Sequence, residues 1–265
     1  SLCHHKGIIK FIGWCTDKKR GYLYFKKANK GSLCGMIRRC QEGDRDPLFD
    51  DTHKLIIAYG IASAMKYLHS MDILHRDLKS TNILLNDRLY PFISDFSTAI
   101  WKYDTFTENE IQQTTAKIMA PEFLDNYEKY SRTKPIDVYS YGMVLYFLMT
   151  EKDPYNDENP LKIIERVMKN ERPDFPSNDT PNEKWQRLIR SCWDQDPQCR
   201  PTFAQICDLL ESPEFVTSDI DSTLFESYKE KVSDLSEKVN KYENALRSKE
   251  ESSRNYSIIT FTRRN

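Results

Sequence analysis

The spacing of hydrophobic positions changes along the chain and predicts which elements form. The first part is rich in β-branched and aromatic side chains, and the runs 8–12 and 22–25 predict two short strands around a charged turn at 17–21. Two more short strands are predicted at 83–85 and 91–93, joined through a turn at Asn86 and Asp87.

Helical spacing dominates the middle of the chain. Residues 55–68 (LIIAYGIASAMKYL) repeat apolar positions at the helical period, and we expect Asp51 or Thr52 to cap this helix. Residues 137–149 are apolar nearly all round, which predicts a buried helix. Three more helices are expected near 160–169, 182–194 and 202–211, whereas the polar, Thr-rich stretch 98–115 predicts a long loop.

The pattern changes again after Pro213, beyond which there is neither Gly nor Pro. Apolar residues alternate spacings of three and four over 225–246, which predicts a helix with one apolar stripe. Two interpretations stay open: the stripe lies on its own domain, or it meets a coiled-coil partner. We expect the Ser-, Thr- and Arg-rich residues 252–265 to be a disordered tail.

Charge and composition exclude several classes of protein. Lys and Arg number 39 against 40 Asp and Glu, and this balance argues against a nucleic-acid binder. The longest apolar run, Met143 to Met149, is too short for a membrane segment. Seven cysteines without a C-x-x-C pair indicate reduced thiols and a cytoplasmic location.

Glycine is scarce, and its positions bear on nucleotide chemistry. The chain has only 8 glycines, and none of them forms a G-x-G-x-x-G or G-x-x-x-x-G-K loop. Any phosphate must therefore be held in another way, or by a part that this sequence does not contain.

The richest candidate chemistry lies around the two strands at 83–85 and 91–93. The segment 75–82 reads HRDLKSTN and precedes them, and the segment 94–97 reads SDFS and follows them. The turn between the strands can therefore bring Asp77, Asn82 and Asp95 to one edge. Phosphoryl transfer needs such a set, with one carboxylate to position the attacking hydroxyl and a carboxylate and an amide oxygen to hold Mg²⁺.

Together these two segments resemble the catalytic loop and metal-binding motif of eukaryotic protein kinases. The similarity extends over residues 1–212, with further landmarks in the family's order at 5–13, 120–122, 137–142, 192–193 and 200–202. The Lys79 that follows His75-Arg76-Asp77-Leu78 resembles the serine/threonine pattern. The string HRDLKSTNIL at 75–84 and DVYSYG at 137–142 together resemble the tyrosine-kinase-like group.

This resemblance implies an α+β protein-kinase-like fold, made mainly of the helical C-lobe with a partial β N-lobe and a C-terminal helix. The expected division is a kinase domain at 1–212, a helical extension and candidate coiled coil at 213–251, and the tail at 252–265. The Gly-rich loop, the β3 lysine and the αC glutamate of the family would lie before Ser1. Lys10 is expected to be a surface residue and no substitute for that lysine.

The resemblance also assigns roles to residues around the nucleotide. Asp77 would be the catalytic base, Lys79 the contact to the γ-phosphate, and Asn82 and Asp95 the Mg²⁺ ligands. The residues expected around the adenine of ATP are the gatekeeper Phe25, the hinge residue Ala28 and, beneath the base, Leu84.

A second set of residues would organise the activation segment. Arg76 would pair with a phosphorylated threonine, Thr115 would bridge the catalytic Asp and Lys, and Glu122 would pair with Arg200. Asp137 would bind the backbone of the catalytic loop.

Two positions depart from the family pattern, and several threonines are candidates for phosphorylation. Ser97 and Thr114 stand where the family usually has glycine, and a serine is costly where the backbone needs a positive φ. The candidate phosphorylation sites are Thr105, Thr107 and Thr114.

Two hypotheses for function follow. The first is a protein kinase that uses ATP and Mg²⁺ to phosphorylate Ser or Thr of protein substrates in intracellular signalling. The alternative is a pseudokinase scaffold that acts through protein–protein interaction. The presence of all four of Asp77, Lys79, Asn82 and Asp95 favours the enzyme, since a scaffold has no physical need for the complete set.

Overall fold

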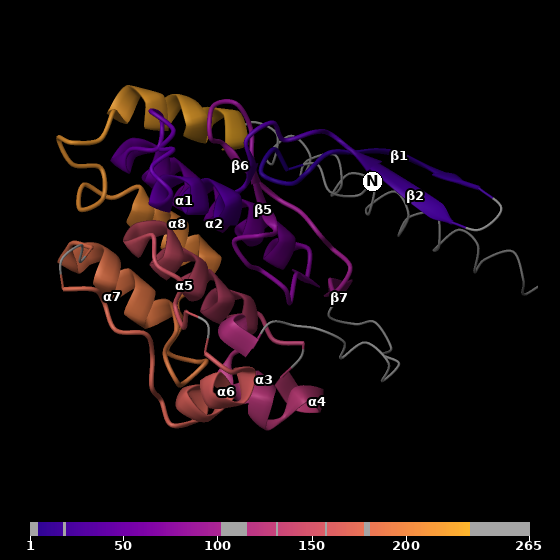
Figure 1. Cartoon of the computed structure of the whole chain (residues 1–265), viewed down its shortest axis with the longest axis vertical. Helices are drawn as coiled ribbons and strands as arrows, with labels where there is room; N and C mark the ends of the chain where they lie inside the picture. Colours follow the sequence, from indigo (N-terminus) through magenta and orange to yellow (C-terminus); the bar gives the residue numbers. More distant parts are fainter. Residues whose placement is uncertain are drawn as a thin grey trace, which may run out of the picture.

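The computed structural model describes residues 5–17, 20–101, 116–130, 132–156, 158–177 and 181–233. Short strands and a larger helical body form an α+β architecture, as predicted (Figure 1). The strands are β1 (Phe11–Thr16), β2 (Gly21–Phe25), β3 (Gly31–Ser32), β4 (Ile73–Leu74), β5 (Ile83–Leu85), β6 (Pro91–Ile93) and β7 (Ile100–Trp101). The helices are α1 (Leu33–Gln41), α2 (Asp51–Ser70), the 3₁₀ turn η2 (Ala116–Ile118), α3 (Pro121–Asp125), α4 (Tyr127–Tyr130), α5 (Pro135–Thr150), α6 (Pro160–Met168), α7 (Glu183–Cys192) and α8 (Phe203–Leu210).

The hairpin of β5 and β6 forms where the sequence predicts it. Its antiparallel register pairs Ile83 with Ile93 and Leu85 with Pro91, and β3 adds to the free edge of β5. The hairpin therefore brings the segments before β5 and after β6 to one end.

The strand predicted over residues 8–12 forms, but it is displaced along the chain: β1 begins at Phe11 and continues to Thr16. The residues before it bond to β6 instead: Ile9 N–H donates to the Ile93 carbonyl at 2.9 Å, and Ile93 N–H donates to the Gly7 carbonyl at 2.8 Å. The backbone of this segment is therefore satisfied by a strand far along the chain rather than by a hairpin partner.

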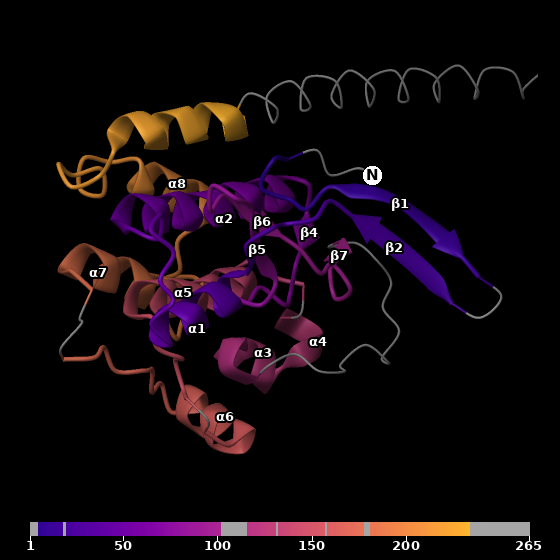
Figure 2. The same ribbon diagram turned by 45° about the horizontal axis from the view of Figure 1, so that its top comes forward.

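The hairpin of β1 and β2 projects away from the helical body (Figures 1 and 2). Large apolar side chains on it are exposed, with Trp14 at 68% and Leu23 at 67% relative accessibility. Exposed apolar surface of this extent is typical of a surface that takes part in an interaction.

Helices α2 and α5 form the centre of the core. Every α5 residue except Pro135 and Met149 is buried, which confirms the buried helix. The predicted cap of α2 is wrong by one or two residues: Asp50 is the N-cap, and its Oδ1 accepts from the His53 N–H at 2.8 Å and lies 2.7 Å from His53 Nδ1. Within the described chain, no helix combines the length and apolar character needed to cross a bilayer.

The stretch 98–115 is not loop throughout. Ile100 and Trp101 form β7, which pairs with β4 through Leu74 and Ile73. The rest of the stretch from residue 102 onward, with Thr115 and the three candidate phosphorylation sites, lies outside the described residues.

Residues 222–233 are helical and lie across α2 and α8 (Figure 2, orange-yellow). Phe225, Tyr228 and Val232 are all buried in the main core, and the rings of Phe225 and Tyr228 meet the Tyr59 ring of α2 edge to face. The first part of the apolar stripe therefore lies on its own domain. The continuation over 235–246 lies outside the described residues, and its coiled-coil partner stays a prediction.

Gly60 makes this packing possible, so we predict that Gly60→Ala destabilises the protein. A Cβ at residue 60 would lie 2.1 Å from the Tyr228 hydroxyl and 2.5 Å from Pro91 Cγ, so at least one of these two buried rings would have to shift. Overpacking of this kind costs about 1–3 kcal/mol, measurable as a lower midpoint in urea unfolding.

The matched control is Gly35→Ala in α1, where the nearest atom to the new Cβ is Ser32 Oγ at 3.4 Å. That substitution should leave the free energy of unfolding unchanged or raise it by up to about 1 kcal/mol. Equal stability of the wild type and Gly60→Ala would contradict the packing described here.

Candidate active site

A buried carboxylate fixes the loop that carries the candidate chemistry. Asp137, in the first turn of α5, is fully buried, and its Oδ1 accepts the Arg76 N–H at 2.8 Å. Its Oδ2 accepts the His75 N–H at 3.0 Å and lies 2.9 Å from His69 Nε2 of α2. This carboxylate therefore joins two helices to the loop, which is the backbone contact that the resemblance implies.

Electrostatics favours the ionised form of this group. Burial by itself would raise the pKa of Asp137, but the hydrogen bond and charge of His69, with the hydrogen bond from the Arg76 N–H, lower it below its ordinary value. The carboxylate is therefore charged at neutral pH, and its hydrogen bonds are charge-assisted.

His75 connects this loop to the segment after β6. Its Nδ1 accepts the Asp77 N–H at 3.3 Å, so Nε2 carries the proton and donates to the Ser94 carbonyl at 3.1 Å. Burial lowers the pKa of His75, which keeps the ring neutral, and the Phe96 ring packs against it. The two polar segments are thus held to each other by an uncharged ring.

One oxygen of Asp77 is held and the other is free. Its Oδ2 lies 2.7 Å from Lys79 Nζ and accepts from Asn82 Nδ2 at 3.0 Å. Its Oδ1 is buried and has no hydrogen-bond partner among the described residues. A buried carboxylate oxygen without a donor is costly, and such atoms occur where a ligand supplies the missing proton.

The end of the β5–β6 hairpin orients Asn82. Its Nδ2 donates to both the carbonyl and the carboxylate of Asp77, which leaves the amide oxygen as the free ligand atom. Its own carbonyl accepts from Ser94 N and Ser94 Oγ at 2.9 and 2.8 Å. Asn82 and the residue before Asp95 are therefore in direct contact.

Asp95 is exposed, and Ser97 holds it. Ser97 Oγ donates to Asp95 Oδ1 at 2.7 Å, and this bond is the main reason why the pKa of Asp95 lies below its ordinary value. The positive φ expected near Ser97 falls on Asp95 instead, at 62°, and Arg76 has a φ of 63°. Strained backbone of this kind concentrates at functional sites.

The donor set suits magnesium better than a metal held by protein alone. Among the described residues, no group of three or more His, Cys, Asp and Glu is arranged to hold a metal ion. Mg²⁺, however, is usually bound by one or two protein oxygens together with waters and phosphate oxygens. The Asn82 amide oxygen and the Asp95 carboxylate match that requirement.

A buried ion pair joins the helices that lie next to the candidate active site. Arg200 donates to both carboxylate oxygens of Glu122 at 2.6 and 2.7 Å, as the resemblance implies, and also to the Pro135 carbonyl at 3.0 Å. The start of α3 and the start of α5 are thus tied to the segment before α8.

The structure does not gather the three residues expected around the adenine. Phe25 is 45% exposed at the end of β2, Ala28 is half-buried in the following turn, and Leu84 is half-buried between Ser32 and Phe92 in the sheet. None of the three lines the cavity between the N-terminal segment, β6 and the C-terminal helix. Thr115 lies outside the described residues.

Sequence reasoning missed two contributors. His69 contacts Asp137 across 68 residues, and no local pattern announces such a contact. The hydrogen bond of Ser97 was open to prediction, because an Asp followed two residues later by Ser is a common local side-chain bond.

Comparison with known proteins finds similarity to protein kinases. The family model described as protein tyrosine and serine/threonine kinase matches residues 1–210. The RGS domain-containing serine/threonine-protein kinase A of Dictyostelium discoideum is 41% identical over 214 residues, which are 80% of this chain and 18% of that protein.

Two similar proteins come from Arabidopsis thaliana. Serine/threonine-protein kinase CTR1 is 33% identical over 209 residues, 78% of this chain and 24% of that protein. Serine/threonine/tyrosine-protein kinase HT1 is 32% identical over 213 residues, 80% of this chain and 52% of that protein. The region that this chain shares with the three relatives thus makes up between 18% and 52% of their own lengths.

We predict that Asp137→Asn destabilises the protein at neutral pH by about 3 kcal/mol, because an amide cannot accept all three hydrogen bonds. The pKa of Asp137 is lower in the folded protein than in the unfolded chain, so its ionised form stabilises the fold above the unfolded pKa. This stabilisation is lost as the pH falls through the folded pKa. The difference in the free energy of unfolding between the wild type and the variant should therefore become smaller below about pH 4.

Urea unfolding midpoints at a series of pH values measure this gap. The control is Asp208→Asn at an exposed position of α8, which should change the free energy of unfolding by less than about 0.5 kcal/mol. A gap that stays constant or widens in acid would show that the Asp137 charge does not stabilise the fold.

Proposed function

Because this chain belongs to the protein tyrosine and serine/threonine kinase family, we propose that it carries the helical lobe of an active protein kinase. The reaction is transfer of the γ-phosphate of ATP to a Ser or Thr hydroxyl of a protein substrate. The observation that carries this proposal is the geometry of Asp77, with one oxygen held and the buried Oδ1 free for a hydroxyl proton.

Asp77 and Lys79 act together in this mechanism. Asp77 Oδ1 accepts a hydrogen bond from the substrate hydroxyl. This bond orients the hydroxyl oxygen for attack on the phosphate, and Asp77 then receives the hydroxyl proton. Lys79, 2.7 Å from Asp77 Oδ2, is close enough to neutralise charge on the transferred phosphoryl group. Asn82 holds Asp77 in place through two hydrogen bonds.

Asn82 and Asp95 would hold the metal through the amide oxygen and the carboxylate. Mg²⁺, when bound there, supplies positive charge against the phosphates of ATP. Ser97 keeps one Asp95 oxygen hydrogen-bonded, so the other is the natural metal ligand. The lowered pKa of Asp95 keeps this ligand ionised at neutral pH.

The serine/threonine assignment rests on Lys79 and on the relatives. Lys79 lies two residues after Asp77, as in the serine/threonine pattern that the sequence resembles. The relatives from Dictyostelium and Arabidopsis are named as serine/threonine kinases, and HT1 as a serine/threonine/tyrosine kinase.

Activity would need more polypeptide than these 265 residues. Leu84 offers a half-buried floor for an adenine, and Phe25 and Ala28 would lie beside it only if a covering sheet formed on the β1–β2 hairpin. The exposed apolar residues of that hairpin suit such a cover. We therefore propose that residues 1–212 are one part of a kinase domain, and that residues 213–233 brace it.

The competing function is a scaffold that binds proteins without transferring phosphate. Upstream sequence discriminates between the two functions: a G-x-G-x-x-G loop and a strand lysine favour the enzyme, and their absence favours the scaffold.

We predict that Asp77→Asn in the full-length protein lowers phosphorylation of a generic protein substrate by roughly 100- to 10,000-fold, because the hydroxyl loses its proton acceptor. Incorporation of labelled phosphate measures the rate. Asp208→Asn, which changes an exposed carboxylate of α8 in the same way, should keep the wild-type rate. A wild-type rate in Asp77→Asn would contradict the assignment of Asp77 as the catalytic base.

We also predict weak Mg-ATP binding and negligible catalysis by the 265-residue chain alone, since it has a floor for the adenine but no Gly-rich loop for the phosphates. Isothermal titration calorimetry measures the affinity. A micromolar dissociation constant for this chain would contradict the prediction.

A further inference from the structure

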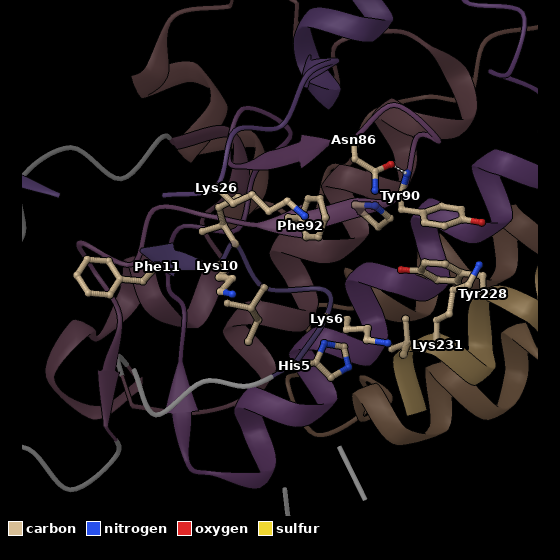
Figure 3. Close-up of a pocket in the computed structure, with 14 residues that line it drawn as sticks. His5, Lys6, Lys10, Phe11, Lys26, Asn86, Tyr90, Phe92, Tyr228 and Lys231 are labelled. Carbon is tan, nitrogen blue, oxygen red and sulfur yellow. Dashed lines mark hydrogen bonds between the residues drawn. The ribbon is translucent and has the colours of Figure 1, made fainter. Parts of the chain in front are cut away.

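One cavity among the described residues lies away from the candidate catalytic residues. It has a volume of about 580 Å³ and lies between the N-terminal segment, strand β6 and the C-terminal helix (Figure 3). None of Asp77, Asn82 and Asp95 lines it. Its size is within the range of ligand-binding pockets, and the proposed function does not use it.

The charged groups around this cavity all have the same sign. Lys6, Lys10, Lys26 and Lys231 line it, and the described lining contains no Asp or Glu. Many other lysines of the molecule form ion pairs, among them Lys30, Lys54 and Lys229. None of the four cavity lysines forms an ion pair with another described residue, so within the described part of the chain their positive charge is not neutralised.

The lysines come from two sides of the cavity. Lys10 immediately precedes β1 and Lys26 immediately follows β2, and the Lys26 N–H donates to the Lys10 carbonyl at 2.8 Å. Lys6 belongs to the N-terminal segment and Lys231 to the C-terminal helix, and Figure 3 shows both on the opposite side from Lys10. A ligand could therefore meet positive charge at both of its ends.

Between the lysines the lining is apolar and aromatic. Ile8, Ile9 and Val232 are buried walls, and the Tyr90 and Tyr228 rings pack with their centroids 4.7 Å apart. The Lys231 ammonium lies 5.7 Å from the centre of the Tyr90 ring, a distance typical of cation–π contacts. The cavity thus pairs an apolar centre with a cationic rim.

Histidine adds no charge to this site. Burial lowers the pKa of His5 to about 4, so its ring is neutral at physiological pH. Its Nδ1 accepts the Gly7 N–H at 2.9 Å, and its Nε2 lies 3.2 Å from Ser63 Oγ. Both ring nitrogens are therefore occupied, and the positive charge comes from lysine alone.

We propose that this cavity binds an acidic peptide segment of a partner protein, with one or two large apolar side chains in the cavity and carboxylates beside the lysines. Charge complementarity carries the choice of an acidic ligand, and the buried apolar lining requires an apolar anchor. A membrane surface is a poorer fit, because these lysines surround a hollow, whereas a bilayer attracts a basic patch that can lie along it.

The two ends of one hairpin would then serve two purposes. Asn82 and Ser94 lie at the open end of β5–β6, beside the candidate catalytic residues, whereas Asn86 and Tyr90 lie at its turn and line the cavity. A bound peptide would therefore tether a partner close to the active site without occupying it.

The test uses the full 265-residue chain and a fluorescein-labelled peptide Glu-Glu-Leu-Phe-Glu-Glu, with binding followed by fluorescence anisotropy. We expect saturable binding that weakens as salt is added. The doubly substituted variant Lys26→Ala with Lys231→Ala removes one lysine from each side and should bind roughly tenfold more weakly. All four lysines are exposed, so these substitutions leave the core intact.

Two matched controls separate this site from general charge attraction. Lys27→Ala with Lys162→Ala removes two exposed lysines that do not line the cavity, and this variant should bind like the wild type. The peptide Glu-Glu-Ser-Ser-Glu-Glu keeps the charge without the apolar anchor and should bind much more weakly than the first peptide.

Any of four results would overturn the proposal. These are no binding of the first peptide, equal binding of both peptides, and equal loss of affinity in the two double variants. The fourth is lysine-dependent binding of the chain to phosphatidylserine vesicles without binding of the peptide, which would assign the lysines to a membrane.

Discussion

The site depends on one buried charge. Asp137 begins α5 in the middle of the helical body, and its two oxygens accept hydrogen bonds from the backbone of a loop and from a side chain of α2. Without this carboxylate, the N–H groups of His75 and Arg76 would be buried without acceptors, which is costly. These hydrogen bonds stabilise the loop in the conformation that positions Asp77.

The β5–β6 hairpin supplies the second constraint. Its strands have only three residues each, yet their register brings the Asn82 carbonyl within hydrogen-bond distance of Ser94, twelve residues later. A rigid hairpin positions polar side chains more precisely than a free loop does, because its ends cannot move independently. The turn of the same short hairpin lines the cavity with the lysine rim, so one element contributes to both the candidate active site and the cavity.

Much of this organisation is predictable from the sequence, and the misses have physical causes. The apolar α5 and the β5–β6 pair follow from local patterns, and the spacing of the motifs around that pair is enough to predict that Asp77, Asn82 and Asp95 lie at one edge. The strand predicted over residues 8–12 begins only at Phe11, because the backbone just before it forms hydrogen bonds with Ile93 instead. The contact of His69 with Asp137 depends on how two helices pack, which no local pattern in the sequence encodes.

Gly60 and Tyr228 have a consequence for how this sequence can evolve. The hydroxyl of Tyr228 occupies the space that a side chain at residue 60 would need, although the two residues are far apart along the chain. Residue 60 has no space for a side chain while Tyr228 stays in place, so homologous proteins should vary at these two positions together. A relative with a larger residue at the first position should carry a smaller one at the second, or lack the C-terminal helix altogether.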